Sequence, residues 1–294
     1  MTCCSRTAAE PPGEEVERAR PLLGTTVAIR VSGLPREEAD RAIARGFAAI
    51  AEVHRLMSFH DAASDLSRLN RGASRAPVAV DRRTLTVLRH ALAAAEASRG
   101  LFDPTVGGAL AARGVLPRPA DAPEPDPAAT WRDVTIAGSR VRFGRPLWLD
   151  FGGIAKGHAV DAALAAMALP ATAQAVVNAG GDLRVAGLAP ELVQLGLDVP
   201  GGVPLVELAD GALASSTGAR RWGAAAPVHL GGAHGRPVGK RRFAAVAAPC
   251  CMTADWLTKP VLALGSRAVP LLRRFQAIAW LYSARGGWRV LGGD

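Results

Sequence analysis

The sequence of 294 residues contains no run of about 18 uncharged apolar residues, which a membrane-spanning helix would need. We therefore expect no membrane span. Residues 1–6 also lack the apolar run of a secretory signal. We expect the chain as written to be cytoplasmic, and periplasmic if the true start codon lies upstream.

Cysteine is scarce and its spacing excludes the common zinc motifs. The four cysteines form two adjacent pairs, Cys3-Cys4 and Cys250-Cys251. Neither pair has the separation of about two to four residues that is found between zinc ligands. The pattern implies no disulfide and is compatible with a reducing compartment.

Lysine is also scarce, because only Lys156, Lys240 and Lys259 occur among 35 basic residues. The formal net charge of +9 could suggest a nucleic-acid partner. The arginines, however, are scattered rather than gathered in one stripe, and net charge alone speaks only to non-specific association. We expect no nucleic-acid partner.

Apolar residues make up 49% of the chain, enough for a sizeable core and against a mainly disordered protein. We interpret residues 1–20 as a flexible N-terminal arm and residues 21–294 as the folded domain. Five prolines in residues 115–130 predict a loop within it, since proline lacks the backbone donor of helices and central strands.

Periodicity predicts a mixture of helices and strands. Residues 25–31 are rich in β-branched residues, and apolar residues then recur at helical spacing from Ala39 to Met57. Asp81 is a candidate N-cap of a second helix, which ends before Gly100. Further strands are predicted at residues 134–136, 141–143 and 147–149, helices at 156–167 and near Pro270, and a hairpin at the end. This mixture predicts a mixed α/β (α+β) fold, with β-sheets flanked by helices and function in the loops.

Two polar segments have a structural and a functional interpretation of similar weight. Residues 57–70 (MSFHDAASDLSRLN) end a helix in hydrogen-bonding side chains, which also suit caps and turns. Residues 102–107 (FDPTVG) place a carboxylate and a hydroxyl on a tight turn, which could equally be a plain Asx turn.

Residues 149–161 (LDFGGIAKGHAVD) carry the strongest signal. A strand passes through two glycines into a helix that has Lys156 in its first turn. Exposed N–H groups at a helix N-terminus beside a lysine suit a phosphate group. The segment matches neither the Walker loop nor the G-x-G-x-x-G pattern.

Three further segments are candidates. Residues 177–183 (VNAGGDL) form a strand–glycine–carboxylate turn or a plain hairpin, and residues 215–218 (SSTG) with Arg220 and Arg221 suit an anion. Asp255 precedes an apolar helix and is either an N-cap or a ligand for a hard metal ion.

In this order, the segments resemble the ApbE family, the FAD:protein FMN transferases. The resemblance covers about residues 22–265. It rests on Gly24-Thr25, S-D-L-S-R-L-N at 64–70, F-D-P-T-V-G at 102–107, L-D-x-G-G-I-A-K-G-x-A-V-D at 149–161 and N-A-G-G-D-L-R at 178–184.

The resemblance implies an ApbE-like fold with FAD in a cleft between two parts. It also implies that FMN is transferred from FAD through a phosphoester to a Thr or Ser of an acceptor flavoprotein with a D-G-x-T/S-G-A-T motif, with release of AMP. In the family a magnesium ion neutralises the pyrophosphate.

The resemblance also assigns roles to residues. The base falls on His229, and the metal ligands fall on the Gly153 carbonyl and Asp255. Contacts to FAD fall on Leu23, His60, Asp103, Thr105, Asp150, Lys156, Gly180, Gly181 and Asp182, to which we add Thr217 of the hydroxyl-rich segment.

The sequence departs from the family pattern at the metal site. The Thr that serves as a metal ligand four residues after the Asp is Lys259 here, and a hydroxyl stands one place earlier at Thr258. A shift of one position along a helix changes the direction of the side chain by about 100°, so Thr258 does not take the place of the missing Thr. We therefore expect Lys259 to pair with Asp255, and magnesium to bind weakly or to be replaced by Lys259.

Three smaller departures lie elsewhere: the Asp of the family's H-x-I-D-P stretch is missing after His229, Leu23 replaces a Met, and His60 replaces a Tyr. They leave two alternatives to the active transferase. One is an FAD-binding carrier or regulatory protein with a degenerate metal site. The other is an FAD pyrophosphatase with water as the acceptor.

Overall fold

The computed structural model describes residues 15–187, 189–196, 202–217 and 242–293. Its centre is an eight-stranded sheet in which every neighbouring pair of strands is antiparallel. The strands, in spatial order, are β1 (Val16–Leu22), β2 (Thr25–Ser32), β6 (Gln174–Ala179), β7 (Asp182–Ala186), β10 (Ala212–Thr217), β11 (Arg242–Ala248), β12 (Ile278–Ser283) and β13 (Gly287–Leu291).

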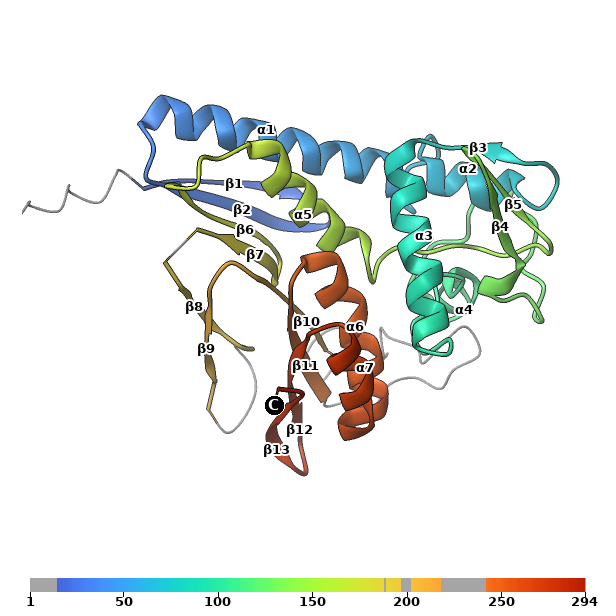
Figure 1. Cartoon of the computed structure of the whole chain (residues 1–294). Helices are drawn as coiled ribbons and strands as arrows, with labels where there is room; N and C mark the ends of the chain where they lie inside the picture. The colour runs from blue at the N-terminus through green and yellow to red at the C-terminus, as the bar shows by residue number, and fades with distance from the viewer. Residues whose placement is uncertain (1–14, 188, 197–201, 218–241, 294) are drawn as a thin grey trace, which may run out of the picture.

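Helices cover one face of this sheet (Figure 1). They are α1 (Arg36–Met57), α5 (Ala155–Met167), α6 (Cys251–Leu264) and α7 (Val269–Arg274), with a 3-10 turn η2 (Gly265–Ala268) after α6. The buried residues of α1 include the predicted positions from Ala39 to Met57. In the described part of the chain, no helix is both long and apolar enough to cross a membrane.

A second, mainly helical part is inserted between β2 and β6 and lies beyond one end of α1 (Figure 1). It contains α2 (Asp65–Gly72), α3 (Arg82–Ala97), α4 (Gly107–Ala111), the 3-10 turn η1 (Trp131–Asp133) and a small sheet of β3 (Val78–Ala79), β5 (Arg140–Phe143) and β4 (Val134–Ala137). A separate hairpin of β8 (Glu191–Gln194) and β9 (Leu205–Leu208) follows β7.

The structure confirms the mixed α/β (α+β) fold, the Asp81 cap of α3, the proline-rich loop between α4 and η1, and the C-terminal hairpin. The predicted arm over residues 1–20 is too long, because Val16 is buried and β1 pairs with β2 along its whole length. Because β1 is an edge strand, most of its side chains are exposed and polar. Its sequence therefore lacks the apolar pattern that would distinguish a strand from a flexible arm. Residues 1–14 lie outside the described residues.

Three other details differ from the prediction. Residues 147–149 are not a strand, because the side chain of Asn70 takes the place of a partner strand: it donates to Leu149 O (3.0 Å) and accepts from Leu149 N (2.7 Å). Residues 65–72 are a short helix, α2, capped by Ser64. Asp255 is not an N-cap, since α6 begins four residues earlier.

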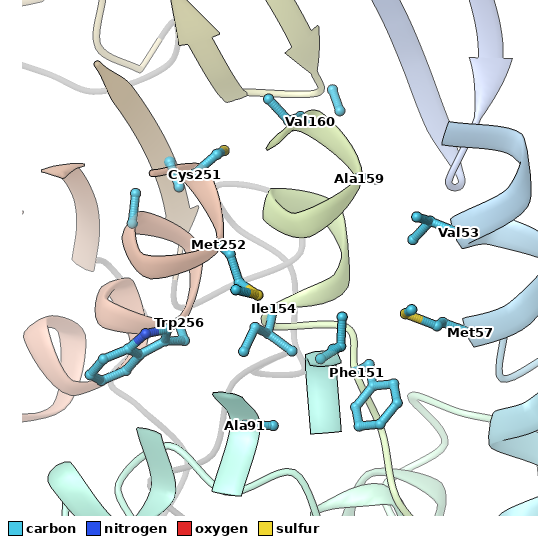
Figure 2. Close-up of a cluster of buried hydrophobic side chains, with 14 of the residues drawn as sticks. Val53, Met57, Ala91, Phe151, Ile154, Ala159, Val160, Cys251, Met252 and Trp256 are labelled. Atoms are coloured by element: carbon cyan, nitrogen blue, oxygen red, sulfur yellow. The ribbon is translucent and has the colours of Figure 1, made fainter. Parts of the chain in front are cut away.

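The core is continuous between the helices (Figure 2). Phe151 and Ile154, where the chain enters α5, lie between Met57 of α1 and Met252 of α6. Burying such side chains removes apolar surface from water, at about 25 cal/mol per Å². The first turn of α5, which carries Lys156, is therefore held by the core on both sides.

The crossing of α5 and α6 is unusually close at Gly157. A Cβ atom at this position would lie 2.3 Å from the backbone oxygen of Cys251. Asp161, one turn further along α5, accepts hydrogen bonds from the N–H groups of Cys251 (2.9 Å) and Met252 (2.8 Å). Asp161 thus caps the N-terminus of α6 from a neighbouring helix. Cys250, which stands at the N-cap position of α6, makes no side-chain capping hydrogen bond.

We predict that Gly157→Ala destabilises the protein by about 2–3 kcal/mol, because the added methyl group meets backbone that cannot move aside. The matched control is Gly46→Ala in α1, where the nearest atoms are the ends of the Ile29 and Met167 side chains. The control should stay within about 1 kcal/mol of the wild type. Chemical denaturation measures the free energy of unfolding of the wild type and of both variants. A Gly157→Ala variant as stable as the wild type would contradict the close crossing.

Candidate active site

Two adjoining pockets form a cleft between the helical part and the sheet part. One, of about 190 Å³, is lined mainly by residues 101–116, Gly153 and Lys259. The other, of about 390 Å³, is lined by the turn after β1, the end of α1 and the start of α5. Leu116, Asp150 and Gly152 line both. The cleft has the size and mixed polarity of a small-molecule site.

The segment before α5 runs along this cleft and is fixed by the helical part. Asn70 holds the backbone of Leu149, and Asp150 N donates to Pro104 O (2.8 Å). Asp150 thus lies where the two pockets meet. Burial raises the pKa of its carboxyl group, which favours the protonated form that can donate to an anionic oxygen.

Asp103 and Thr105 form an Asx turn at the edge of the smaller pocket. Asp103 Oδ1 accepts from the backbone N (2.8 Å) and the hydroxyl (2.6 Å) of Thr105. Only Asp103 of the two lines the pocket. The structural interpretation of this segment as an Asx turn is therefore confirmed, and the turn also places Asp103 in the lining of the cleft.

Two tight hairpin turns carry further predicted residues. Leu23 and Gly24 join β1 to β2, Gly180 and Gly181 join β6 to β7, and all four residues have positive φ. Positive φ at both central positions is the mark of the hairpin-compatible type I′ turn. Leu23 adopts it without being glycine, and it lines the larger pocket.

Gly180 and Gly181 lie outside the lining of the cleft and contact other parts of the sheet. Neither lines a pocket described above, and a Cβ atom on Gly180 would lie 2.4 Å from Thr25 Oγ1. The turn therefore packs against the start of β2 and places Asp182 at the first position of β7.

Lys156 forms an ion pair with Asp182, which is fully buried. Burial alone would lower the pKa of Lys156, but the carboxylates of Asp255 and Asp182 outweigh it and raise that pKa. Burial and the charge of Asp255 raise the pKa of Asp182. Lys156 therefore carries its positive charge at the wall of the larger pocket.

Lys259 forms a second buried ion pair, with Asp255. As predicted, Lys259 Nζ donates to Asp255 Oδ1 (2.6 Å). Burial alone would raise the pKa of Asp255, but Lys156 and Lys259 outweigh it and lower that pKa. Two lysines and two aspartates thus form a buried cluster of four charges between α5, α6 and β7.

The residues present do not fit a divalent metal ion. Asp255 Oδ1 already binds Lys259, and its Oδ2 accepts from Gly157 N (3.3 Å). The hydroxyl of Thr258 already bonds to Asp255 O (2.7 Å) and Ser216 Oγ (2.8 Å). Within the described ranges, no group of three or more His, Cys, Asp or Glu is arranged to hold a metal ion.

The remaining predicted residues are less central. His60 is exposed and lines the larger pocket beside Phe59. Thr217 ends β10 and lines neither pocket; its hydroxyl bonds to Arg242 O (3.5 Å). His229, Gly218, Arg220 and Arg221 lie outside the described residues.

Sequence reasoning missed three residues that build the site. Asn70 fixes Leu149, Asp161 caps α6, and Ser216 approaches Lys259 Nζ (3.4 Å). Asn70 and Asp161 both lie within sequence motifs described above. Their membership of these motifs was the sequence signal that could have identified them as site residues. Ser216 was noted only as part of a hydroxyl-rich segment.

Comparisons with known proteins find relatives that are similar in sequence. An FAD:protein FMN transferase from Vibrio cholerae is 28% identical over 285 residues, covering 87% of this chain and 83% of the relative. One from Rhodobacter capsulatus is 33% identical over 188 residues, covering 60% of this chain and 36% of the relative.

Solved structures resemble the whole fold. The flavin transferase ApbE from Vibrio cholerae has a TM-score of 0.80 at 26% identity and covers 95% of this chain and 97% of its own. An ApbE protein from Thermotoga maritima has a TM-score of 0.79 at 25% identity, with the same coverage of both chains.

A sequence profile of the ApbE family matches residues 23–281, a range that holds both pockets and all four charges of the buried cluster. With the fold, the cleft and this match in agreement, the chain belongs to the ApbE family.

Proposed function

We propose that this protein transfers FMN from FAD to a Thr or Ser hydroxyl of an acceptor protein and releases AMP. The observation that carries the proposal is the cleft itself: two pockets meet at Asp150 and Gly152, with Lys156 and Lys259 in their walls. Such a shape suits a molecule in which a pyrophosphate joins two ring systems. The names of the relatives support the same reaction.

The reaction is a phosphoryl transfer. The acceptor hydroxyl oxygen bonds to the phosphorus of the FMN half, the bond from that phosphorus to the bridging oxygen breaks, and AMP leaves with that oxygen. Catalysis of this kind depends on positioning and on neutralising the phosphate charge. Lys156 supplies positive charge at the wall of the cleft.

The hydroxyl proton needs an acceptor. We assign this role to His229, on the resemblance alone, because a neutral imidazole can take a proton near neutral pH. The acceptor protein is expected to carry the D-G-x-T/S-G-A-T motif. No step of this mechanism passes through a metal ion.

Incubation with FAD and an acceptor domain that carries this motif tests the proposal. Flavin fluorescence of the acceptor in a denaturing gel, with an equal amount of AMP, supports the transferase. AMP and FMN released without labelling would indicate the pyrophosphatase instead. Bound FAD that stays intact would indicate a carrier.

We predict that FAD binds more tightly than FMN or riboflavin, because only FAD has a pyrophosphate to contact the lysines. Lys156→Ala should weaken FAD binding by about 1–3 kcal/mol, the value of a lost charge-assisted contact. Calorimetry measures the affinities, with Arg41→Ala on the exposed side of α1 as the control. Equal affinity for FAD and FMN in the wild type would exclude a pyrophosphate site.

We also predict that His229→Ala abolishes transfer and leaves FAD binding nearly intact, because a base acts on the acceptor hydroxyl and not on FAD. Gel fluorescence follows transfer, and calorimetry follows FAD binding. Thermal unfolding serves as the control. Joint loss of FAD binding and thermal stability would make His229 a structural residue.

A further inference from the structure

The ammonium group of Lys259 is held at a defined position in the wall of the cleft. Lys259 lies one turn after Asp255 on α6 and is 7% exposed. Its Nζ donates to Asp255 Oδ1 (2.6 Å) and to Asp255 O (2.9 Å), and lies 3.4 Å from Ser216 Oγ. Three oxygen atoms thus fix this cation, which still lines the smaller pocket.

The side chain of Lys259 also lies directly on Gly153. A Cβ atom built on Gly153 would be 2.8 Å from Lys259 Cε and 3.4 Å from Lys259 Nζ. Any other residue at position 153 would push the lysine away. The ammonium group therefore occupies the space between Gly153 and Asp255, the two positions to which the family resemblance assigns metal ligands.

The charges around this position are already balanced. Lys156 and Lys259 carry two positive charges and their partners Asp182 and Asp255 carry two negative ones, while burial favours the protonated form of Asp150. A divalent ion added to this cluster would create a buried excess of positive charge, which is costly in a poorly solvated site. Replacing Lys259 by a neutral residue would remove one positive charge and free Asp255 Oδ1 for a divalent ion.

We propose that Lys259 is a tethered cation that takes the place of a divalent metal ion and contacts the pyrophosphate of the substrate as a catalytic residue. The contact with pyrophosphate rests on the proposed function. Lys259 keeps its proton throughout and stabilises negative charge on the phosphate oxygens as AMP leaves. Transfer is therefore independent of magnesium.

The first test is metal binding by the full chain, titrated with Mg²⁺ in a calorimeter and with Mn²⁺ by electron paramagnetic resonance. We compare the wild type, Lys259→Thr and Arg267→Thr. The control removes the same charge from an exposed position just after α6. Lys259→Thr should bind both ions at least about tenfold more tightly than the wild type and the control.

The second test is transfer to an acceptor domain with the D-G-x-T/S-G-A-T motif, with EDTA or with Mg²⁺. For the wild type and for Arg267→Thr, the transfer rate in EDTA should be within about twofold of the rate in Mg²⁺. Lys259→Thr should be inactive in EDTA and gain activity with Mg²⁺. Lys259→Met, which offers neither a charge nor a hydroxyl, should lose activity under both conditions.

Tight Mg²⁺ binding by the wild type, or loss of its transfer in EDTA, would overturn the proposal. These wild-type results need no variant, so misfolding of Lys259→Thr cannot obscure them. If that variant folds only with Mg²⁺, thermal unfolding will show the gain in stability, which supports the proposal. If the wild type binds no FAD, the proposed function fails, while the metal titrations still decide whether Lys259 excludes a metal ion.

Discussion

The close approach of α5 to α6 at Gly157 is the constraint on which the site depends. Because a glycine stands there, Asp161 reaches the first N–H groups of α6 and caps it. The same crossing brings Asp255 Oδ2 to Gly157 N and sets the ion pairs of the two helices side by side. A backbone contact at one glycine thus determines the distance between the two helices that carry Lys156 and Lys259.

The buried cluster of two lysines and two aspartates is a poor source of stability, since desolvation offsets most of the attraction within such pairs. The contribution of the cluster is to hold two positive charges at fixed positions. Lys156 and Lys259 face the cleft with partners behind them, and each partner is nearly fully buried. Positive charge fixed in this way needs no reorganisation when a phosphate group becomes more negative.

Local signals in the sequence were sufficient for the fold class and for the main segments that line the cleft. Periodicity predicted α1, α3 and the C-terminal hairpin because each has one clear apolar face or a strong turn. It failed where a distant side chain replaced regular pairing, as Asn70 does for Leu149, and at the edge strand β1, where few side chains are buried.

The sequence by itself determined the family motifs, the order of the polar segments and the unusual lysine at position 259. Spacing on one helix even predicted its pairing with Asp255, because residues four apart share a face. Only the tertiary structure decided that Lys259 lies on Gly153, that Lys156 pairs with Asp182, and that both lysines line one cleft. Those contacts join segments about 100 or 30 residues apart, and only packing brings such segments together.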